Sequence, residues 1–244
     1  MVSLISLIIL VSDDVKTVSK LIKIAKRLRD IREIIVVSQI NNRDIYDTAK
    51  RLGAEVIYQS FHGYPRRGVS MRDGFYLSTG EVIMYVDADL GVVDEKILSE
   101  IYSPILSGEA DYVRGVFPGV SSKLINEIVK PLADHFYPEI AKISHYFSKI
   151  QAGLRKIFEN TEWDLGWGVE LLILINTFKY GLRVIEKDLS LKSREVKLFE
   201  IGSDAIYELI ETIVKKALRD KKITGNEAEE LLNKYRLLIK EKIS

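Results

Sequence analysis

The sequence of 244 residues contains no cysteine and only three histidines. The absence of cysteine excludes disulfide bonds, thiol nucleophiles and zinc–thiolate sites. The histidines, His62, His135 and His145, do not have the spacing of metal ligands. Each of them is therefore expected to be packed or exposed rather than bound to a metal.

The chain also lacks an excess of charge and a long apolar run. It has 36 basic and 35 acidic residues, so no general attraction to nucleic acid is expected. A membrane helix needs about 18 apolar residues or more. The run from Val2 to Val11 is only as long as a strand and has no basic leader. We therefore expect a soluble, cytoplasmic protein without a transmembrane segment.

The first half of the chain alternates between strand and helix patterns. Apolar, β-branched strands are expected at 4–11, 33–37, 54–58 and 81–86, and helices between them. This order predicts a doubly wound, mostly parallel α/β sheet with flanking helices. Ligands are then expected at the carboxyl ends of the strands.

The second half is less regular. The pattern predicts a helix at 94–106 that Pro104 ends early, a strand at 112–117, an amphipathic helix at 121–132 that reaches Pro131, a helix from 169, and strands at 182–186 and 189–192. Two last helices are expected to pack on the core or on a second subunit, the second one with a capping box of Thr224 and Glu227. We therefore expect a domain at 1–202 and a C-terminal helical extension at 203–244.

Two carboxylates, Asp87 and Asp89, follow the buried strand at 81–86. Their spacing places both side chains on one face of an extended chain. Mg²⁺ usually takes one or two carboxylates and completes its shell with phosphate and water, so the pair suits Mg²⁺ or Mn²⁺ bridging a diphosphate. Two ordinary solvated Asp residues at a strand end are the alternative.

Two further segments suit an anionic or nucleoside ligand. The loop at 63–68 contains Arg66 and Arg67 and leads into a helix, where glycines, guanidinium groups and the helix N-terminus favour phosphate, unless it is a solvated basic turn. Asp13 and Asp14 end the first strand. Asp14 is expected to cap the next helix, whereas Asp13 either caps it or binds a nucleobase or ribose.

The segment from Trp163 to Glu170 combines two tryptophans with two glycines. Such a loop suits a planar or sugar-like ligand, although core tryptophans are an equal alternative. Glu170 begins an otherwise apolar helix, so its carboxylate must be paired, solvated or functional.

Several of these segments together resemble a known family. Segments 53–57 and 78–90 (Ser-Thr-Gly-Glu-Val-Ile-Met-Tyr-Val-Asp-Ala-Asp-Leu) resemble the family 2-like glycosyltransferases of the GT-A fold. Segments 111–115, 130–139 and 166–170 (Gly-Trp-Gly-Val-Glu) are similar to glucosyl-3-phosphoglycerate synthases. The resemblance implies a GT-A fold and transfer of a hexose from a nucleotide diphosphate sugar to a small phosphorylated acceptor such as 3-phosphoglycerate, assisted by Mg²⁺ or Mn²⁺.

The resemblance also implies roles for individual residues. Asp87 and Asp89 match the metal–diphosphate pair, and Asp89 and Glu170 are the expected catalytic residues. The residues expected to bind the nucleotide sugar are Asp13, Ser38, Arg67, Gly68, Asp87 and Ala88. The residues expected to bind the acceptor are Ser122, Lys123, Trp167 and Gly168.

Other functions stay open. The altered acceptor loop at 119–123 is compatible with a polyprenyl-phosphate hexosyltransferase. Ser38 and Arg194 stand where the family has other residues at the nucleobase and the metal, which leaves a non-catalytic nucleotide-sugar-binding protein of the same fold. A nucleotidyltransferase is disfavoured because the first strand lacks a Gly-rich arginine loop. A receiver-like signalling domain is disfavoured by the distance in sequence between Asp14 and Asp87. The apolar C-terminal helices are compatible with a homodimer.

Overall fold

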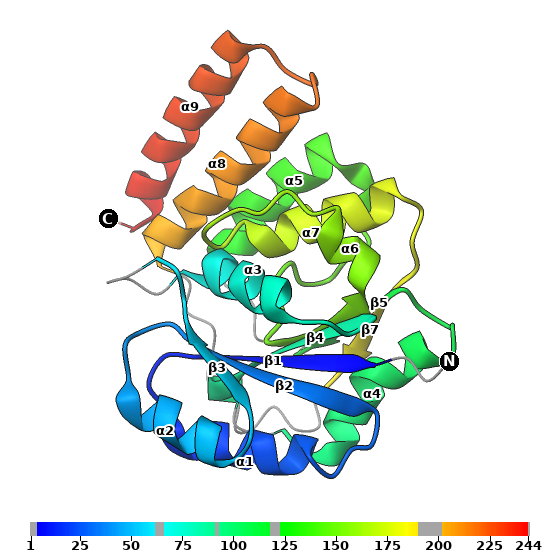
Figure 1. Cartoon of the computed structure of the whole chain (residues 1–244). Helices are drawn as coiled ribbons and strands as arrows, with labels where there is room; N and C mark the ends of the chain where they lie inside the picture. Colours follow the sequence, from blue (N-terminus) through cyan, green and yellow to red (C-terminus); the bar gives the residue numbers. More distant parts are fainter. Residues whose placement is uncertain (1–3, 62–65, 91–92, 118–122, 190–201, 244) are drawn as a thin grey trace.

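The computed structural model describes residues 4–61, 66–90, 93–117, 123–189 and 202–243. A seven-stranded sheet in the order β3-β2-β1-β4-β6-β5-β7 forms the middle layer (Figure 1). Its strands are β1 (Ile5–Val11), β2 (Ile31–Ser38), β3 (Glu55–Tyr58), β4 (Val82–Asp87), β5 (Tyr112–Val116), β6 (Ile150–Leu154) and β7 (Val184–Asp188).

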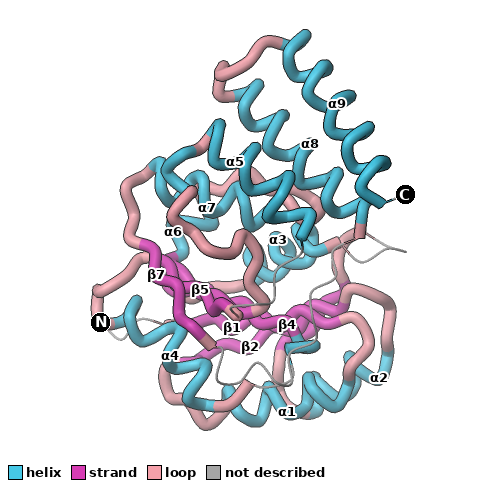
Figure 2. The backbone as a smooth tube through the Cα atoms, turned by 180° about the vertical axis from the view of Figure 1, so that it is seen from behind, coloured by secondary structure: helices cyan, strands magenta, loops and turns pink. Residues whose placement is uncertain are grey.

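Helices cover both faces of this sheet. In Figures 1 and 2, α1, α2 and α4 lie on one face, and α3 with α5 to α8 lies on the other. The helices are α1 (Val15–Ala25), α2 (Arg43–Arg51), α3 (Arg67–Leu77), α4 (Glu95–Leu106), α5 (Lys130–Phe136), α6 (Arg155–Glu159), α7 (Val169–Lys179), α8 (Ser203–Arg219) and α9 (Gly225–Ile243). Three short turns of helix complete the elements, Ala88–Leu90, Ile125–Val129 and Pro138–Ile140.

The sheet is mostly parallel, as the sequence predicts. β1 runs parallel to β2 and β4, β2 to β3, and β5 to β7. β6 is antiparallel to both of its neighbours, β4 and β5. The sequence did not predict β6, because a five-residue segment with a glutamine and a glycine carries little strand propensity of its own. Pairing on both edges holds it in place.

The central strands β1 and β4 are buried along their whole length because both faces of the sheet are covered, and most of their residues are apolar. Leu7 and Ile9 of β1 belong to the core under α1, α2 and α4. Ile8 and Leu10 point to the opposite core, which they share with α3, α5 and α7. All four side chains are nearly or fully buried. The sheet therefore separates two hydrophobic cores. The polar residues at its strand ends do not belong to either core.

Two proline expectations are wrong. Pro104 does not end its helix early, because α4 continues to Leu106 with Pro104 inside it. Pro131, which the expected helix reaches, does not end it either. It lies at the second residue of α5, which continues directly from the π-helical turn Ile125–Val129. One strand, β7, replaces the expected strand at 182–186, and most of the expected strand at 189–192 lies outside the described residues.

The C-terminal segment packs on the core through α8. Ile206, Leu209, Ile210 and Ile213 are fully buried and belong to the same core as α5 and α7. The predicted capping box of α9 is confirmed. The backbone N–H of Thr224 donates to Glu227 Oε2 over 2.7 Å, and that of Glu227 donates to Thr224 Oγ1 over 3.4 Å. The division of the chain at residue 203 stays a prediction.

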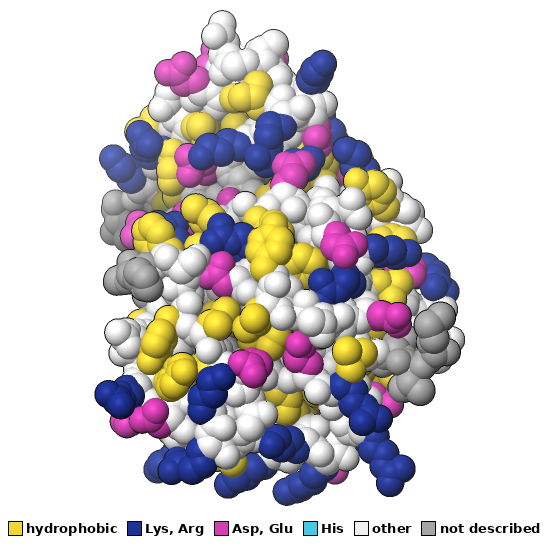
Figure 3. All heavy atoms as spheres, in the orientation of Figure 1, with side chains coloured by type: hydrophobic (Ala, Val, Ile, Leu, Met, Phe, Trp, Pro, Cys, Tyr) yellow, Lys and Arg dark blue, Asp and Glu magenta, His cyan; other side chains and the backbone are white. Residues whose placement is uncertain are grey.

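Charges of both signs are interspersed on the molecular surface. On the face shown in Figure 3, Asp and Glu side chains lie among the Lys and Arg side chains over most of the surface, and Lys and Arg predominate along the lower edge. Within the described residues, no helix is both long enough and apolar enough to cross a membrane.

Candidate active site

Three parallel strands end together at one edge of the sheet. Leu10 of β1 pairs with Asp87 of β4, and Val11 pairs with Ser38 of β2. The chain winds from β1 to β2 and β3 on one side and then returns to β4 on the other, so β1 and β4 form the switch point where open α/β sheets bind ligands. The loops that follow β1, β2 and β4 therefore meet at this edge.

A pocket lies at this edge of the sheet. Of the six residues expected to bind a nucleotide sugar, four line it, namely Asp13, Arg67, Asp87 and Ala88. Asp89 and Trp167 contribute as well. The complete lining consists of Leu10, Val11, Ser12, Asp13, Asp14, Gln39, Arg67, Asp87, Ala88, Asp89 and Trp167. We call it the switch-point pocket.

Asp14 caps α1, as predicted. Its carboxylate accepts hydrogen bonds from the backbone N–H of Thr17 over 2.9 Å and from the Thr17 hydroxyl over 2.5 Å. These hydrogen bonds lower the pKa of Asp14. The Asp14 carboxylate is therefore engaged in capping α1. Asp13 also lines the pocket, and its contact with a nucleoside stays a prediction.

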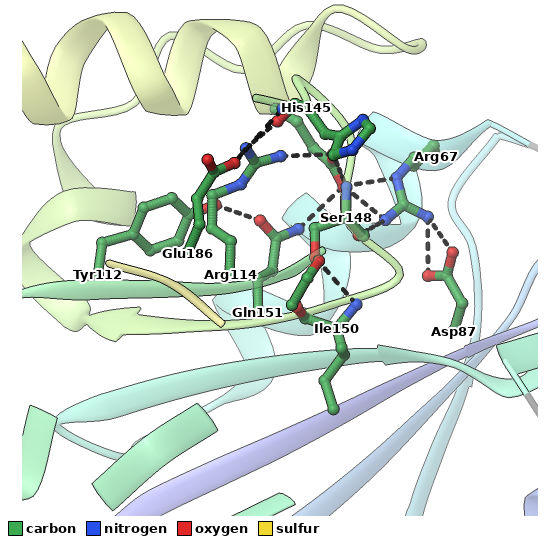
Figure 4. A network of polar contacts seen from close by, with 11 residues as sticks. Arg67, Asp87, Tyr112, Arg114, His145, Ser148, Ile150, Gln151 and Glu186 are labelled. Atoms are coloured by element: carbon green, nitrogen blue, oxygen red, sulfur yellow. Dashed lines mark hydrogen bonds and ion pairs between the residues drawn. The ribbon is translucent and has the colours of Figure 1, made fainter. Parts of the chain in front are cut away.

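Arg67 is the centre of the polar network in Figure 4. Its Nη1 donates to both carboxylate oxygens of Asp87 over 2.7 Å. Its Nε and Nη2 donate to Glu170 Oε1 over 2.9 and 2.5 Å, and Nη2 also reaches the Ser148 carbonyl over 2.8 Å. Burial lowers the pKa of Arg67, but the two carboxylates outweigh burial and raise it above its usual value. Burial raises the pKa of Asp87 to about 6, against the effect of Arg67.

Glu170 is a fully buried carboxylate in the first turn of α7, where the helix dipole favours negative charge. Besides Arg67, it accepts a hydrogen bond from Gln151 Nε2 over 2.9 Å and one from the Ser148 backbone N–H over 2.8 Å. Of the three possibilities that the sequence allowed, the structure shows the paired one. In this arrangement Glu170 positions Arg67, and its own contact with sugar or acceptor stays a prediction.

A second layer of polar groups surrounds Glu170. Arg114 is fully buried, with its Nη2 3.6 Å from Glu170 Oε2 and its Nη1 3.9 Å from Glu186 Oε1. Its Nη1 also donates to the His145 carbonyl. Tyr112 donates its hydroxyl proton to Gln151. The network thus joins β5, β6 and β7 to the residues that line the pocket (Figure 4).

Asp89 has a cationic partner that the sequence did not indicate. Lys149 Nζ donates to Asp89 Oδ2 over 2.7 Å. The Lys149 side chain is only 9 % exposed, whereas that of Asp89 is 60 % exposed. Each carboxylate of the predicted metal pair therefore contacts a basic side chain, Arg67 for Asp87 and Lys149 for Asp89.

Two backbone N–H groups at the N-terminus of α3, where an anion site was predicted, have partners within the protein. The backbone N–H groups of Gly68 and Val69 donate to the carbonyls of Gly166 and Leu165 over 3.1 and 3.2 Å. These donors are thus used to hold the 163–168 loop. Gly68 does not line the switch-point pocket among the described residues, and its predicted role in donor binding stays untested.

The close approach at Gly68 leads to a stability prediction. A Cβ atom there would lie 1.9 Å from the backbone oxygen of Asp164, far inside van der Waals contact. We expect Gly68→Ala to lower the free energy of unfolding by about 1–3 kcal/mol, the usual cost of overpacking. Urea unfolding would measure the loss. Gly225→Ala is the control, because a Cβ there meets nothing within 4 Å. An equal loss in both variants would contradict the prediction.

The two tryptophans have different positions. Trp163 packs against the core, with its ring centroid 5.6 Å from that of Phe75. Trp167 lines the switch-point pocket, and its ring centroid lies 6.0 Å from the guanidinium carbon of Arg67. Trp167 is thus on the side where the donor is expected, although the sequence assigned it to the acceptor.

The other predicted acceptor residues lie elsewhere. Ser122 is outside the described residues. The Lys123 side chain is 83 % exposed and pairs with Glu127 over 3.7 Å. At Gly168, an added Cβ would lie 2.1 Å from Thr212 Oγ1, so this glycine allows α8 to pack on the start of α7. The described residues do not bring these acceptor candidates together in the switch-point pocket, and their roles stay predictions.

Ser38 is fully buried, and its hydroxyl donates to the Ile40 carbonyl over 2.6 Å. It therefore shapes the turn after β2. The next residue, Gln39, lines the pocket in its place. Its amide is a side chain that can hydrogen-bond a nucleobase or ribose.

The donor set of the pocket fits a hard divalent cation only in part. Among the described residues no cluster of three or more His, Cys, Asp or Glu side chains forms a complete metal site. Asp89 is exposed and Asp87 lies two residues away at the same strand end, which gives two carboxylates. This number is what Mg²⁺ takes when phosphate and water supply its other ligands. A metal here therefore depends on the ligand to complete its coordination.

Three residues of the site were missed from sequence because they come from β6 and the residues before it. Ser148, Lys149 and Gln151 reach the site since β6 inserts antiparallel next to β4, and the backbone N–H of Asp87 donates to the Lys149 carbonyl over 2.8 Å. The only signal was the alternation of Lys149 and Gln151 with apolar neighbours, which is too short to identify a strand.

Comparison with known proteins gives relatives of one kind. No protein-family model matches the chain. The glucosyl-3-phosphoglycerate synthase of Petrotoga mobilis is 26 % identical over 227 residues, which cover 85 % of this chain and 69 % of that enzyme. The synthase of Mycobacterium tuberculosis is 22 % identical over 176 residues, 64 % of this chain and 54 % of the enzyme. The matched part of the chain thus corresponds to 69 % of the length of the first relative and to 54 % of the length of the second.

Solved structures show the same fold. The Mycobacterium tuberculosis synthase in complex with Mn²⁺, UDP-glucose and phosphoglyceric acid superposes with a TM-score of 0.73 at 19 % identity, covering 88 % of this chain and 79 % of the other. The mannosyl-3-phosphoglycerate synthase of Rubrobacter xylanophilus gives a TM-score of 0.75 at 18 % identity, covering 91 % and 77 %. The chain has the GT-A fold of these enzymes, and the resemblance stated from its sequence is confirmed.

Proposed function

We propose that this chain is a glycosyltransferase that moves a hexose from a nucleotide diphosphate sugar to a small phosphorylated acceptor such as 3-phosphoglycerate. The observation that carries the proposal is the switch-point pocket, where Asp13, Asp87, Asp89 and Arg67 come together at the ends of β1 and β4. Its relatives by sequence and fold are named as synthases of this kind.

The chemistry follows from the charges of the pocket. A nucleotide diphosphate is an anion, and the pocket offers it a guanidinium beside several carboxylates. Asp87 and Asp89 would hold a divalent cation, which would supply positive charge to stabilise the departing diphosphate. Arg67 supplies positive charge at the same place and is fixed in advance by Glu170 and Ser148, so that no reorganisation is needed when the diphosphate departs.

The aromatic and polar groups at the rim suit the rest of the donor. Trp167 presents an indole beside Arg67, and Asp13 and Gln39 follow β1 and β2. We propose that Asp13 and Gln39 hydrogen-bond the nucleoside, because a carboxylate and an amide can accept or donate to ribose hydroxyls and base edges.

Asp89→Ala tests this proposal most directly. We expect the variant to lose metal-dependent hexose transfer by about 100-fold or more, the usual size of a lost electrostatic contact to the transition state. Transfer from UDP- and GDP-hexoses to 3-phosphoglycerate, with Mn²⁺ or with a chelator, is the measurement. Glu95→Gln is the control, since Glu95 pairs with Arg27 at an exposed position of α4. Normal turnover by Asp89→Ala would contradict the assigned role.

The donor itself can be identified by thermal shift. A ligand that binds only the folded state raises the melting temperature. A screen of UDP- and GDP-sugars, each with and without Mg²⁺ or Mn²⁺, is expected to give a shift with one nucleotide sugar that requires the metal. No shift with any of them would contradict donor binding.

A second candidate is a protein that binds a nucleotide sugar without transferring it. Both carboxylates of the predicted metal pair are engaged in ion pairs, Asp87 with Arg67 and Asp89 with Lys149. A thermal shift with a nucleotide sugar, together with no transfer and no hydrolysis of that sugar, would favour this candidate. The cytoplasmic location and the homodimer stay predictions, and light scattering would test the latter.

A further inference from the structure

Lys149 has no role in the transfer reaction proposed above, yet it forms an ion pair with Asp89, one of the two carboxylates of the predicted metal pair. Its ammonium lies 2.7 Å from Asp89 Oδ2. The backbone places it there, because the Lys149 carbonyl accepts from the Asp87 N–H over 2.8 Å and extends the ladder between β4 and β6. Lys149 and Asp87 are therefore opposite each other at the end of two paired strands.

The two side chains of this ion pair differ in their exposure to solvent. The Lys149 side chain is 9 % exposed, so its stem is packed and its ammonium is held at a defined position. The Asp89 side chain is 60 % exposed and lines the switch-point pocket. A ligand that enters the pocket can reach Asp89 directly, and it meets a carboxylate whose charge Lys149 already neutralises.

A divalent metal at Asp89 would be close to this ammonium. Like charges a few ångströms apart repel strongly outside bulk water, and two carboxylates alone provide a hard cation with only part of its shell. A diphosphate changes both conditions, because it adds negative charge and phosphate oxygens. The metal and the donor are therefore expected to favour each other's binding.

We propose that Lys149 is a specificity-determining residue of the donor site whose ammonium competes with the divalent metal for Asp89, so that the metal binds well only together with a diphosphate. This inference deepens the proposed function and rests on it for the identity of the metal's partner ligand. Lys149 neutralises the charge of Asp89 before the donor binds, and metal binding then depends on the donor.

Arg67 does not have this role. Its guanidinium contacts Asp87, Glu170 and the Ser148 carbonyl together, so it is part of the buried network and cannot leave Asp87 without breaking several hydrogen bonds. Lys149 contacts the more exposed carboxylate, and that contact is the one a cation from solvent can replace.

Binding of Mn²⁺ alone to the full chain tests the proposal without any turnover. Free Mn²⁺ can be followed by its electron paramagnetic resonance signal. We expect Lys149→Met to bind Mn²⁺ about tenfold or more tightly than the unchanged chain, because a repelling charge beside Asp89 is gone. Lys149→Arg keeps the charge and is expected to bind as weakly as the unchanged chain. Lys149→Gln provides a second neutral side chain in case the methionine variant does not fold.

The double variant Lys149→Met with Asp89→Asn shows whether the gain in Mn²⁺ affinity depends on Asp89. Its Mn²⁺ affinity is expected to fall back to that of the unchanged chain or below. Equal affinities for Lys149→Met and the unchanged chain, or a gain that persists without Asp89, would overturn the proposal. Failure of sugar transfer would overturn the proposed function and leave this comparison valid, since it uses Mn²⁺ alone.

Addition of UDP gives an independent readout. Because coupling between two ligands is reciprocal, UDP is expected to increase Mn²⁺ affinity more in the unchanged chain than in Lys149→Met. An equal increase in both would also overturn the proposal.

Discussion

Replacing Arg67 by methionine is expected to lower the free energy of unfolding by about 3–5 kcal/mol, the cost of leaving buried charges without their partner. Arg67 is the common partner of two carboxylates, Asp87 and Glu170, of which Glu170 has no exposed surface. No water can replace the guanidinium at Glu170 without opening the packing around α7. Urea unfolding of the full chain would measure the loss.

Two further variants show whether the loss comes from burial of charge. Arg27→Met removes an exposed ion pair with Glu95, in which the two side chains are 67 % and 46 % exposed, and should cost no more than about 1 kcal/mol. Combining Arg67→Met with Glu170→Gln removes one of the stranded charges and should recover part of the stability. If the double variant were no more stable than Arg67→Met, the buried-charge explanation would be wrong.

Stability and donor binding should separate in these variants. The combination of Arg67→Met and Glu170→Gln is expected to fold better than Arg67→Met and still to bind the nucleotide sugar poorly, because the guanidinium is missing. Arg67→Lys keeps one positive charge but lacks the planar fork that reaches Asp87, Glu170 and Ser148 together. Its donor affinity should lie between that of the unchanged chain and that of the methionine variant.

Removal of residues 203–244 is expected to prevent folding. α8 buries Ile206, Leu209, Ile210 and Ile213 completely, in the core that it shares with α5 and α7. Burial of one such side chain contributes roughly 1.5–3 kcal/mol, so the loss is comparable with the whole stability of a domain, about 5–15 kcal/mol. Circular dichroism and thermal unfolding of the shortened chain would measure it.

A shorter truncation is the matched control. Removal of 225–244 deletes α9, whose buried side chains include Ala228 and Ile239 and whose other described residues are mostly exposed or half-buried. This variant should fold with a lower melting temperature. If the chain without 203–244 folded as well as the chain without 225–244, the extension predicted at residue 203 would be an independent unit and the expected coupling through α8 would be wrong.

Sequence reasoning succeeded where local pattern and tertiary structure agree. The strands β1, β2 and β4 and the pair Asp87 and Asp89 at the end of β4 were predicted because buried parallel strands are mostly apolar and ligands gather at their carboxyl ends. The caps at Asp14 and at Thr224 with Glu227 were predicted because capping depends on residues three or so positions apart.

Several contacts of the candidate site residues were not predicted from the sequence. The missing side chain of Gly68 allows the backbone of Asp164 to approach closely, and the hydroxyl of Ser38 donates to the Ile40 carbonyl. The roles of both residues in donor binding stay predictions. Trp163 and Trp167 could not be told apart, because both rings pack against the same core and only Trp167 also lines the pocket.

The sequence by itself determined the alternation of strands and helices, the apolar cores and the placement of Asp13, Asp87 and Asp89 at strand ends, because each of these follows from periodicity over a few neighbouring residues. Only the tertiary structure decided which charges meet. β6 pairs between β4 and β5 and carries Lys149 to Asp89 and Gln151 to Glu170, across 60 and 19 residues of sequence. Contacts of this kind depend on the order of strands in the sheet, and no local pattern encodes them.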